Sequence, residues 1–231
     1  EGDEVSDAQV ELSAGPVTLR VRSDEEGYFQ ARVPLPPRHA GGGWAEVDAR
    51  LVQGMSSYRT VIRAGVAGED AAFGVISDID DTILPSGATR LTELIRNTLF
   101  HNARSRLAFA GVAAFYQALV RGPRERGPAA NPIFYVSSSP WNLYDFLEDF
   151  FELNGVPEGP ILLRDLGVDT DKFIKEGHDH KLDKIERVLS AFPELPFVLI
   201  GDSGQEDPEL YRESVKRHPG QIRTIYIRDV S

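Results

Sequence analysis

Two aspartates separated by a single residue, Asp78 and Asp80, follow an apolar run in this 231-residue chain. The β-branched residues Val75 and Ile76 before them indicate a buried strand. In a strand, residues two apart share a face, so both carboxylates would point the same way. Carboxylates that close repel each other unless a cation lies between them. The pair predicts a chemical site at the carboxyl end of a strand, and an acidic turn is the simpler alternative.

Three further polar segments follow predicted strands or open a helix. Ser137 and Ser138 come directly after a strand, and Lys181 opens a predicted helix. After another strand, Asp202 begins an acidic stretch that reaches Asp207. A parallel sheet brings the carboxyl ends of its strands together at one edge. These segments are therefore expected to converge with the two aspartates, although they are far apart in sequence.

The chemistry that needs such a set is phosphoryl transfer through an aspartate. Asp78 would attack phosphorus and form an acyl-phosphate, which divides one difficult hydrolysis into two easier steps. Asp80 would protonate the leaving oxygen and later activate water. Because an anionic nucleophile must approach an anionic phosphate, the site also needs fixed positive charge.

Mg²⁺ would supply part of that charge, held by Asp78, Asp202 and a backbone carbonyl. Lys181 would supply the rest, while a hydroxyl and backbone N–H groups at Ser137 and Ser138 would hold the phosphate oxygens. Taken alone, a serine after a strand is more often a helix cap, and a lone lysine is usually a solvated charge. The order and spacing of all four segments make the combination specific.

The elements that must position these residues change in kind near residue 73. Residues 1–72 show short alternating segments and no predicted helix, which is typical of a small all-β, sandwich-like domain. Within it, residues 17–22 and 28–33 are predicted to pair as a hairpin around a turn at 24–27. From 73 to 231, strands alternate with helices, which predicts a Rossmann-like α/β core with a parallel sheet and minimal caps.

The remaining predicted elements have the following bounds. The strands are 44–52, 58–64, 74–79, 132–136, 160–163, 197–200 and 222–227, and the helices are 111–120, 141–153, 181–192 and 208–217, the last with Asp207 as N-cap. The long connection 85–110 carries apolar residues at helical spacing. It predicts either a helical flap over the site or an ordinary amphipathic helix packed on the domain.

Composition narrows the partners and the location. A formal net charge of −11 argues against nucleic acid and against purely electrostatic docking on an anionic membrane. The chain has no cysteine, which fits a reducing compartment, and no run long enough for a membrane span. The expected location is the cytoplasm, with peripheral membrane contact. Because the chain begins at Glu1, a removed signal peptide and secretion stay open.

The four polar segments together resemble the haloacid dehalogenase superfamily. More narrowly, five segments look like the App1-type phosphatidate phosphatase catalytic domain: SDIDDTI (77–83), YVSSSPW (135–141), HK (180–181), LIGDSGQ (199–205) and the closing residues 223–230 with IYIRD. The resemblance extends from residue 73 to the end of the chain, whereas no motif is matched in the β-rich part before it.

The resemblance implies a Mg²⁺-dependent phosphatase that converts phosphatidate to diacylglycerol and phosphate, with a phospholipid partner at a membrane surface. By position, Asp78 is the nucleophile and Asp80 the acid/base. Ser137 and Lys181 bind the phosphate, and Thr82 and Ser138 are counted with them as substrate-binding residues.

On the metal side, the resemblance implies Asp202 and Asp207 beside Asp78. The contribution of Asp80 to the metal is assigned to its backbone carbonyl, with its side chain set toward the leaving group. Glu206 stands where this family would have a non-acidic residue, so either Glu206 or Asp207 supports the metal.

Two alternative functions stay open from the sequence alone. One is a phosphomonoesterase of the same superfamily acting on a soluble or protein substrate. The other is a non-catalytic protein that binds a lipid or another partner on this scaffold, since fold does not fix function.

Several other residues have two interpretations each. His178 and His180 are better explained by helix capping or substrate contact than by a zinc site. Arg164 with Asp165 would form a surface salt bridge or bind a head-group oxygen. Trp141 would lie at a membrane surface or pack on the first turn of its own helix.

Overall fold

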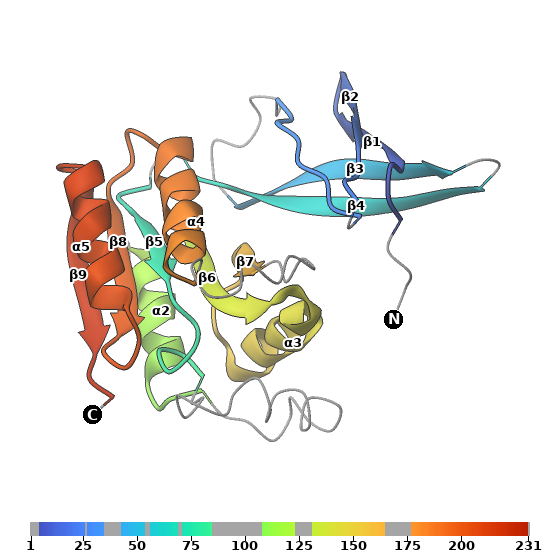
Figure 1. The fold of residues 1–231 in the computed structure, drawn as a ribbon. Coiled ribbons are helices and arrows are strands. Elements are labelled where there is room, and N and C mark those ends of the chain that lie inside the picture. The colour runs from blue at the N-terminus through green and yellow to red at the C-terminus, as the bar shows by residue number, and fades with distance from the viewer. Residues whose placement is uncertain are drawn as a thin grey trace. The chain divides into compact units, whose positions relative to one another are not determined.

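The computed structural model divides into two compact units, Glu1–Glu69 and Asp70–Ser231. Each contains one sheet in the part of the chain that the structure describes (Figure 1). The described residues are 5–25, 27–34, 43–53, 56–68, 71–84, 108–122, 131–164 and 177–230.

The first unit holds a four-stranded antiparallel sheet. Its strands are β1 (Gln9–Ala14), β2 (Val17–Arg22), β3 (Gly43–Gln53) and β4 (Ser56–Val66), in the order β2-β1-β3-β4. One face is the core side, where Val10 and Leu12 of β1 pack with Val47 and Ala49 of β3. The described residues of this unit thus form one sheet, without the second sheet that a sandwich requires.

The predicted hairpin between residues 17–22 and 28–33 is wrong. β2 pairs instead with β1, with Leu12 opposite Leu19, and residues 28–33 form no strand. The chain does turn back after β2, where the Tyr28 backbone N–H donates to the Asp24 carboxylate at 2.9 Å. Residues 28–33 alternate because Ala31 and Val33 pack on the apolar face of the sheet, not because a neighbouring strand pairs with them.

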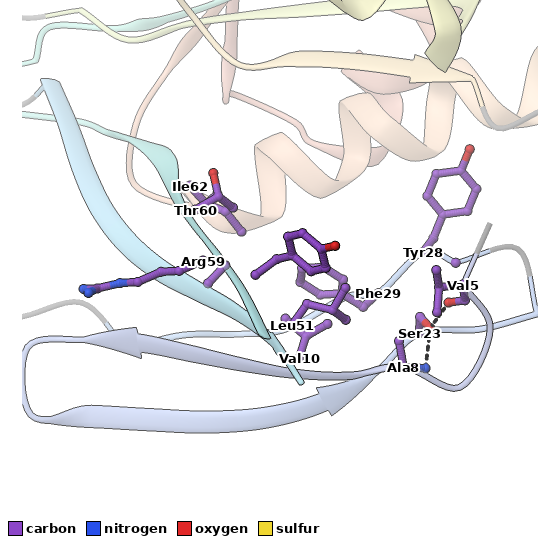
Figure 2. Close-up of a pocket in the computed structure, with 13 residues that line it drawn as sticks. Val5, Ala8, Val10, Ser23, Tyr28, Phe29, Leu51, Arg59, Thr60 and Ile62 are labelled. Carbon is purple, nitrogen blue, oxygen red and sulfur yellow. Dashed lines mark hydrogen bonds between the residues drawn. The ribbon is translucent and has the colours of Figure 1, made fainter. Parts of the chain in front are cut away.

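A cavity of about 560 Å³ lies between this returning segment and residues 58–62 of β4. Tyr28 and Phe29 of this segment line the cavity together with Tyr58 and Ile62 of β4. At its end, the Ser23 hydroxyl donates to the Val5 carbonyl at 2.7 Å (Figure 2). The side chains that line the cavity are mostly apolar.

The second unit holds a five-stranded parallel sheet in the order β7-β6-β5-β8-β9. The strands are β5 (Gly74–Ser77), β6 (Ile133–Pro140), β7 (Ile161–Arg164), β8 (Phe197–Asp202) and β9 (Ile222–Arg228). The helices are α2 (Val112–Arg121), α3 (Tyr144–Asn154) after the 3₁₀ turn η2 (Trp141–Leu143), α4 (Gly177–Ala191) and α5 (Asp207–Arg217).

Two apolar cores lie on opposite faces of this sheet. On one face, Val75 and Tyr135 pack with Tyr116 of α2 and Phe150 of α3. On the other face, Ile76 and Leu199 pack with Ile185 of α4 and Tyr211 of α5. Consecutive strand residues are buried on opposite sides, which explains why these strands read as continuous apolar runs. The predicted α/β class with a parallel sheet is confirmed.

One prediction cannot be compared with the structure, and another differs from it in detail. Residues 85–107 of the predicted flap lie outside the described residues. Strand β6 runs four residues further than predicted and contains the serines that were expected after it. None of the helices in the described ranges is long and apolar enough to cross a membrane.

Candidate functional site

The four predicted polar segments meet at the carboxyl edge of the parallel sheet. Asp78 directly follows β5, and its backbone N–H donates to the carbonyl of Ile200 in β8 at 2.8 Å. Ser137 lies in the neighbouring strand β6, and Lys181 lies in α4. Figure 1 shows α4 running alongside these strands. The convergence predicted from parallel topology is therefore present.

The side of the site toward β8 carries the charges, and we call it the charged side: Asp78, Lys181, Asp202 and Asp207. The Lys181 ammonium contacts one carboxylate oxygen of Asp78 at 2.6 Å and one of Asp207 at 2.5 Å. All four side chains are buried. One ammonium group cannot neutralise three carboxylates, so this side keeps excess negative charge.

The side toward β6 carries hydroxyl groups, and we call it the hydroxyl side: Asp80, Ser137 and Ser139. The Ser137 hydroxyl donates to Asp80 Oδ2 at 2.7 Å, and the Ser139 hydroxyl donates to the same oxygen at 3.1 Å. The Ser139 backbone N–H donates in turn to Ser137 Oγ at 2.8 Å. Ser138, which the sequence predicts to bind phosphate, is exposed and lies between these two buried serines.

The strand β5 ends at Ser77, one residue before the acids, so the two carboxylates do not share a strand face. The chain turns instead, with Asp81 at φ 55°, and the Ile83 N–H donates to the Ile79 carbonyl at 2.9 Å. Aspartate tolerates this left-handed conformation better than most residues. The turn brings the Thr82 hydroxyl to within 3.1 Å of Asp78 Oδ2, so Thr82 orients that carboxylate.

The loop after β8 fixes Asp202. Its Oδ1 atom accepts hydrogen bonds from the backbone N–H groups of Gly204 at 2.7 Å and Gln205 at 3.0 Å. Its Oδ2 atom is buried and has no hydrogen-bond partner among the described residues. An orphaned carboxylate oxygen in a buried site is costly, which points to a bound cation.

Asp207 is held close to the same strand. Its Oδ2 atom accepts the backbone N–H of Asp202 at 3.1 Å, and a Cβ atom on Gly201 would lie only 2.2 Å from that oxygen. Glycine at position 201 is what lets the carboxylate approach. Helix α5 begins at Asp207 with Glu206 at the N-cap position, which corrects the prediction of Asp207 as N-cap. Asp207 cannot cap because its carboxylate is turned toward Lys181.

The residues of the charged side fit a divalent cation. One carboxylate oxygen each from Asp78, Asp202 and Asp207 lies within 4.8 Å of the others. Mg²⁺ prefers oxygen ligands of this kind. Asp207 is buried and Glu206 is exposed, so the geometry favours Asp207 as the acid that faces a metal. The side chain of Asp80 is not in this group, and the Gln205 amide nitrogen lies 3.5 Å from its backbone carbonyl.

Burial governs the protonation of the site. It raises the pKa of Asp78 well above its ordinary value, against the attraction of Lys181. Burial also raises the pKa of Asp80, against the hydrogen bonds from Ser137 and Ser139, and it raises the pKa of Asp202. Burial by itself would lower the pKa of Lys181, but Asp78 and Asp207 raise it above its ordinary value, so this side chain stays charged.

Sequence reasoning missed two features of the site. Ser139 contacts Asp80, and strand parity would have found it, because residues two apart in a strand share a face. The second feature is a buried chain under Asp78, in which Ser77 Oγ lies 2.6 Å from the Tyr116 hydroxyl and donates to the Asp78 carbonyl at 2.7 Å. No local pattern indicates that Tyr116, in α2, reaches this strand.

Of the secondary candidates, His180 and Arg164 belong to the described residues. His180 is half-buried in α4, and the side chains of His178 and Asp165 lie outside the described residues. Arg164 ends β7, next to Pro140 of β6. Within the described residues, neither His180 nor Arg164 belongs to a group of potential metal ligands.

Comparison with known proteins supports the resemblance inferred from the motifs. The family model of the catalytic domain of phosphatidate phosphatase APP1 matches residues 73–229. Phosphatidate phosphatase APP1 of Saccharomyces cerevisiae is 35% identical over 157 residues, which cover 67% of this chain and 25% of the yeast protein. An uncharacterised protein of Schizosaccharomyces pombe is 26% identical over 217 residues, covering 92% of this chain and 34% of that protein.

The chain spans about a quarter to a third of the length of these two relatives. Among solved structures, a chain of the Pnkp1/Rnl/Hen1 complex is similar at a TM-score of 0.42 and 13% identity, over 77% of this chain and 58% of that chain. A likeness of that size carries no argument about fold or function. The family match, by contrast, covers more than half of the chain and includes all four polar segments. The chain therefore belongs to the family of the phosphatidate phosphatase APP1 catalytic domain.

Proposed function

We propose that this protein is a Mg²⁺-dependent phosphatidate phosphatase that works through an aspartyl-phosphate. The observation that carries the proposal is the division of the site into two sides. One aspartate lies among charges that suit a nucleophile facing a phosphate, and the other lies among hydroxyls that suit a proton carrier. Membership of the APP1 family supports phosphatidate as the substrate.

In the first step, a carboxylate oxygen of Asp78 attacks phosphorus, and the bond from phosphorus to the glycerol oxygen breaks. Asp80 delivers its proton to the departing oxygen of diacylglycerol. Its raised pKa suits this role, because a general acid must hold a proton before the step. The hydrogen bonds from Ser137 and Ser139 aim the Asp80 carboxyl group.

In the second step, water attacks the phosphorus of the acyl-phosphate, and Asp80 takes the proton that the water loses. Phosphate leaves, and the Asp78 carboxylate is restored. Lys181 lies 2.6 Å from Asp78, so its ammonium group is within reach of a phosphoryl group attached there. Lys181 thereby offsets the negative charge of the phosphoryl oxygens in both steps.

Mg²⁺ bound to Asp78, Asp202 and Asp207 would supply further positive charge beside the phosphate. The orphaned Oδ2 atom of Asp202 supports this assignment. A cation there would also favour the anionic form of Asp78, against the burial that raises its pKa.

A substrate panel with the purified chain tests the proposal. We expect Mg²⁺-dependent phosphate release from phosphatidate, including a short-chain form that dissolves as a monomer. Faster turnover of glycerol 3-phosphate or of a phosphopeptide would move the function to a soluble or protein substrate. No release from any phosphomonoester would favour a binding protein on this scaffold.

A further inference from the structure

Two exposed apolar side chains lie on opposite sides of the site. Trp141 directly follows β6, and Val230 lies two residues after β9; 38% and 36% of their surfaces are exposed. In the sheet order β7-β6-β5-β8-β9, the strand that leads to Asp78 lies between β6 and β9. Single exposed apolar residues are ordinary on a protein surface. Here both occur at the edge where the reacting groups lie.

Trp141 is firmly held. Pro140 before it pairs with Arg164 of β7, and Leu143 after it is buried in the core. Its ring stacks on Tyr144, with centroids 5.8 Å apart, and the Tyr144 hydroxyl is in turn 3.3 Å from Glu148. One face of the indole is thus supported, and the ring is presented only two residues beyond Ser139.

Val230 is held in the same way on the other side. Its backbone N–H donates to Ser203 Oγ at 3.1 Å, and a Cβ atom on Gly204 would lie only 2.7 Å from Val230 Cγ2. Gly204 is also the residue whose N–H fixes Asp202. Val230 therefore packs against the loop that carries a proposed metal ligand.

The chemistry of a lipid surface matches these residues. The indole N–H of Trp141 has no hydrogen-bond acceptor among the described residues, while its ring is apolar. Side chains of this kind prefer the boundary between head groups and acyl chains, where one part is wet and the other is dry. Because the protein carries a net charge of −11, attraction to an anionic lipid surface cannot come from charge alone, and apolar contact has to supply it.

We propose that Trp141 and Val230 seat the carboxyl edge of the sheet on a lipid bilayer, with Trp141 as the main anchor. The inference rests on the proposed function, because it explains how the site reaches a lipid phosphate. The phosphate of phosphatidate lies at the membrane surface, whereas Asp78 and Lys181 are buried. The edge that bears them must approach the surface closely, so the residues beside it enter the interface.

Kinetics on two forms of the substrate test the anchor. For Trp141→Ala, we expect roughly tenfold or greater loss of phosphate release from phosphatidate in phosphatidylcholine vesicles, since burial of a large aromatic is lost. Release from monomeric short-chain phosphatidate should be unchanged, and Trp141→Phe should restore most of the vesicle activity. Equal losses on both substrates, or no loss on either, would overturn the proposal.

Fluorescence tests the anchor without reference to activity. The chain has two tryptophans, so Trp44→Phe leaves Trp141 as the single reporter. Vesicles containing phosphatidate should shift its emission to the blue, and brominated acyl chains should quench it. If the protein hydrolyses neither form of phosphatidate but Trp141 is quenched, the anchor stands and the proposed function fails. Unquenched Trp141 in a protein that hydrolyses vesicle phosphatidate overturns the anchor alone.

Discussion

Each side of the site contains a buried carboxylate, and the two sides surround it with different groups. On the charged side, Asp78 lies against the Lys181 ammonium, and two further carboxylates lie nearby. On the hydroxyl side, Asp80 is surrounded by neutral serine donors. Burial raises the pKa of both carboxyl groups; the Lys181 ammonium opposes that rise at Asp78, and hydrogen bonds from Ser137 and Ser139 oppose it at Asp80. The surroundings, more than the residue type, divide the proposed roles.

The largest effect is expected at Asp78, the proposed nucleophile. Asp78→Asn keeps the shape of the side chain but removes the attacking oxygen charge, so phosphate release from phosphatidate should fall at least about a thousandfold. Asp149→Asn, the same change at an exposed position of α3, is the matched control and should retain its rate. Comparable rates for Asp78→Asn and the control would remove Asp78 from the chemistry.

The second-largest effect is expected at Asp80, and its size should depend on the leaving group of the substrate. Asp80→Asn should slow phosphatidate hydrolysis about a hundredfold or more, because diacylglycerol leaves poorly without a proton. With an aryl phosphate, whose leaving group needs no proton, the rate of the first step should fall much less. Steady-state and burst kinetics with both substrates measure this difference. If aryl and lipid phosphates lose equally in the first step, Asp80 is not the acid.

A smaller effect concerns the metal. Mg²⁺ should raise the melting temperature of the protein by a few degrees, since a ligand that binds only the folded state stabilises it. Asp202→Asn should abolish most of this rise, because Asp202 presents the orphaned oxygen, whereas Glu206→Gln should preserve it. Thermal melting with and without Mg²⁺ measures both. A Mg²⁺ effect that survives in Asp202→Asn and is lost in Glu206→Gln would reverse the assignment.

The smallest effect is expected at Ser139. Removing one of two hydroxyl donors to Asp80 should lower the rate of phosphatidate hydrolysis by about three- to tenfold, the size of a single hydrogen bond. The loss should appear in kcat with little change in KM, since Ser139 acts through Asp80. Ser139→Thr keeps the hydroxyl group and should recover part of the rate. A change confined to KM would make Ser139 a substrate contact.

Strand parity explains which parts of the site the sequence predicted. The four segments were predictable because parallel strands necessarily end at one edge. Residues two apart share a face only while a strand continues: β5 has ended before Asp78 and Asp80, whereas β6 still includes Ser137 and Ser139. Strand ends depend on pairing with neighbours, which a local pattern does not contain.

The β-rich unit shows the same limit. Residues 28–33 alternate like a strand, yet they pack across the face of a sheet whose pairing belongs to β1. Alternation indicates that one side of a segment is buried, but it does not identify the element that covers that side. The link from Tyr116 through Ser77 to Asp78 could not be predicted from the sequence for a similar reason, because it depends on how α2 packs on the sheet.

Trapping the covalent intermediate tests the central claim, that Asp78 on the charged side is the nucleophile. Protein mixed with short-chain phosphatidate and Mg²⁺ is quenched with borohydride, which reduces an aspartyl-phosphate to homoserine, and the peptides are then sequenced by mass spectrometry. We expect homoserine at position 78 in the wild-type protein and in Asp80→Asn, and none in Asp78→Asn. Homoserine at position 80 or 202, or turnover without any reduced aspartate, would contradict it.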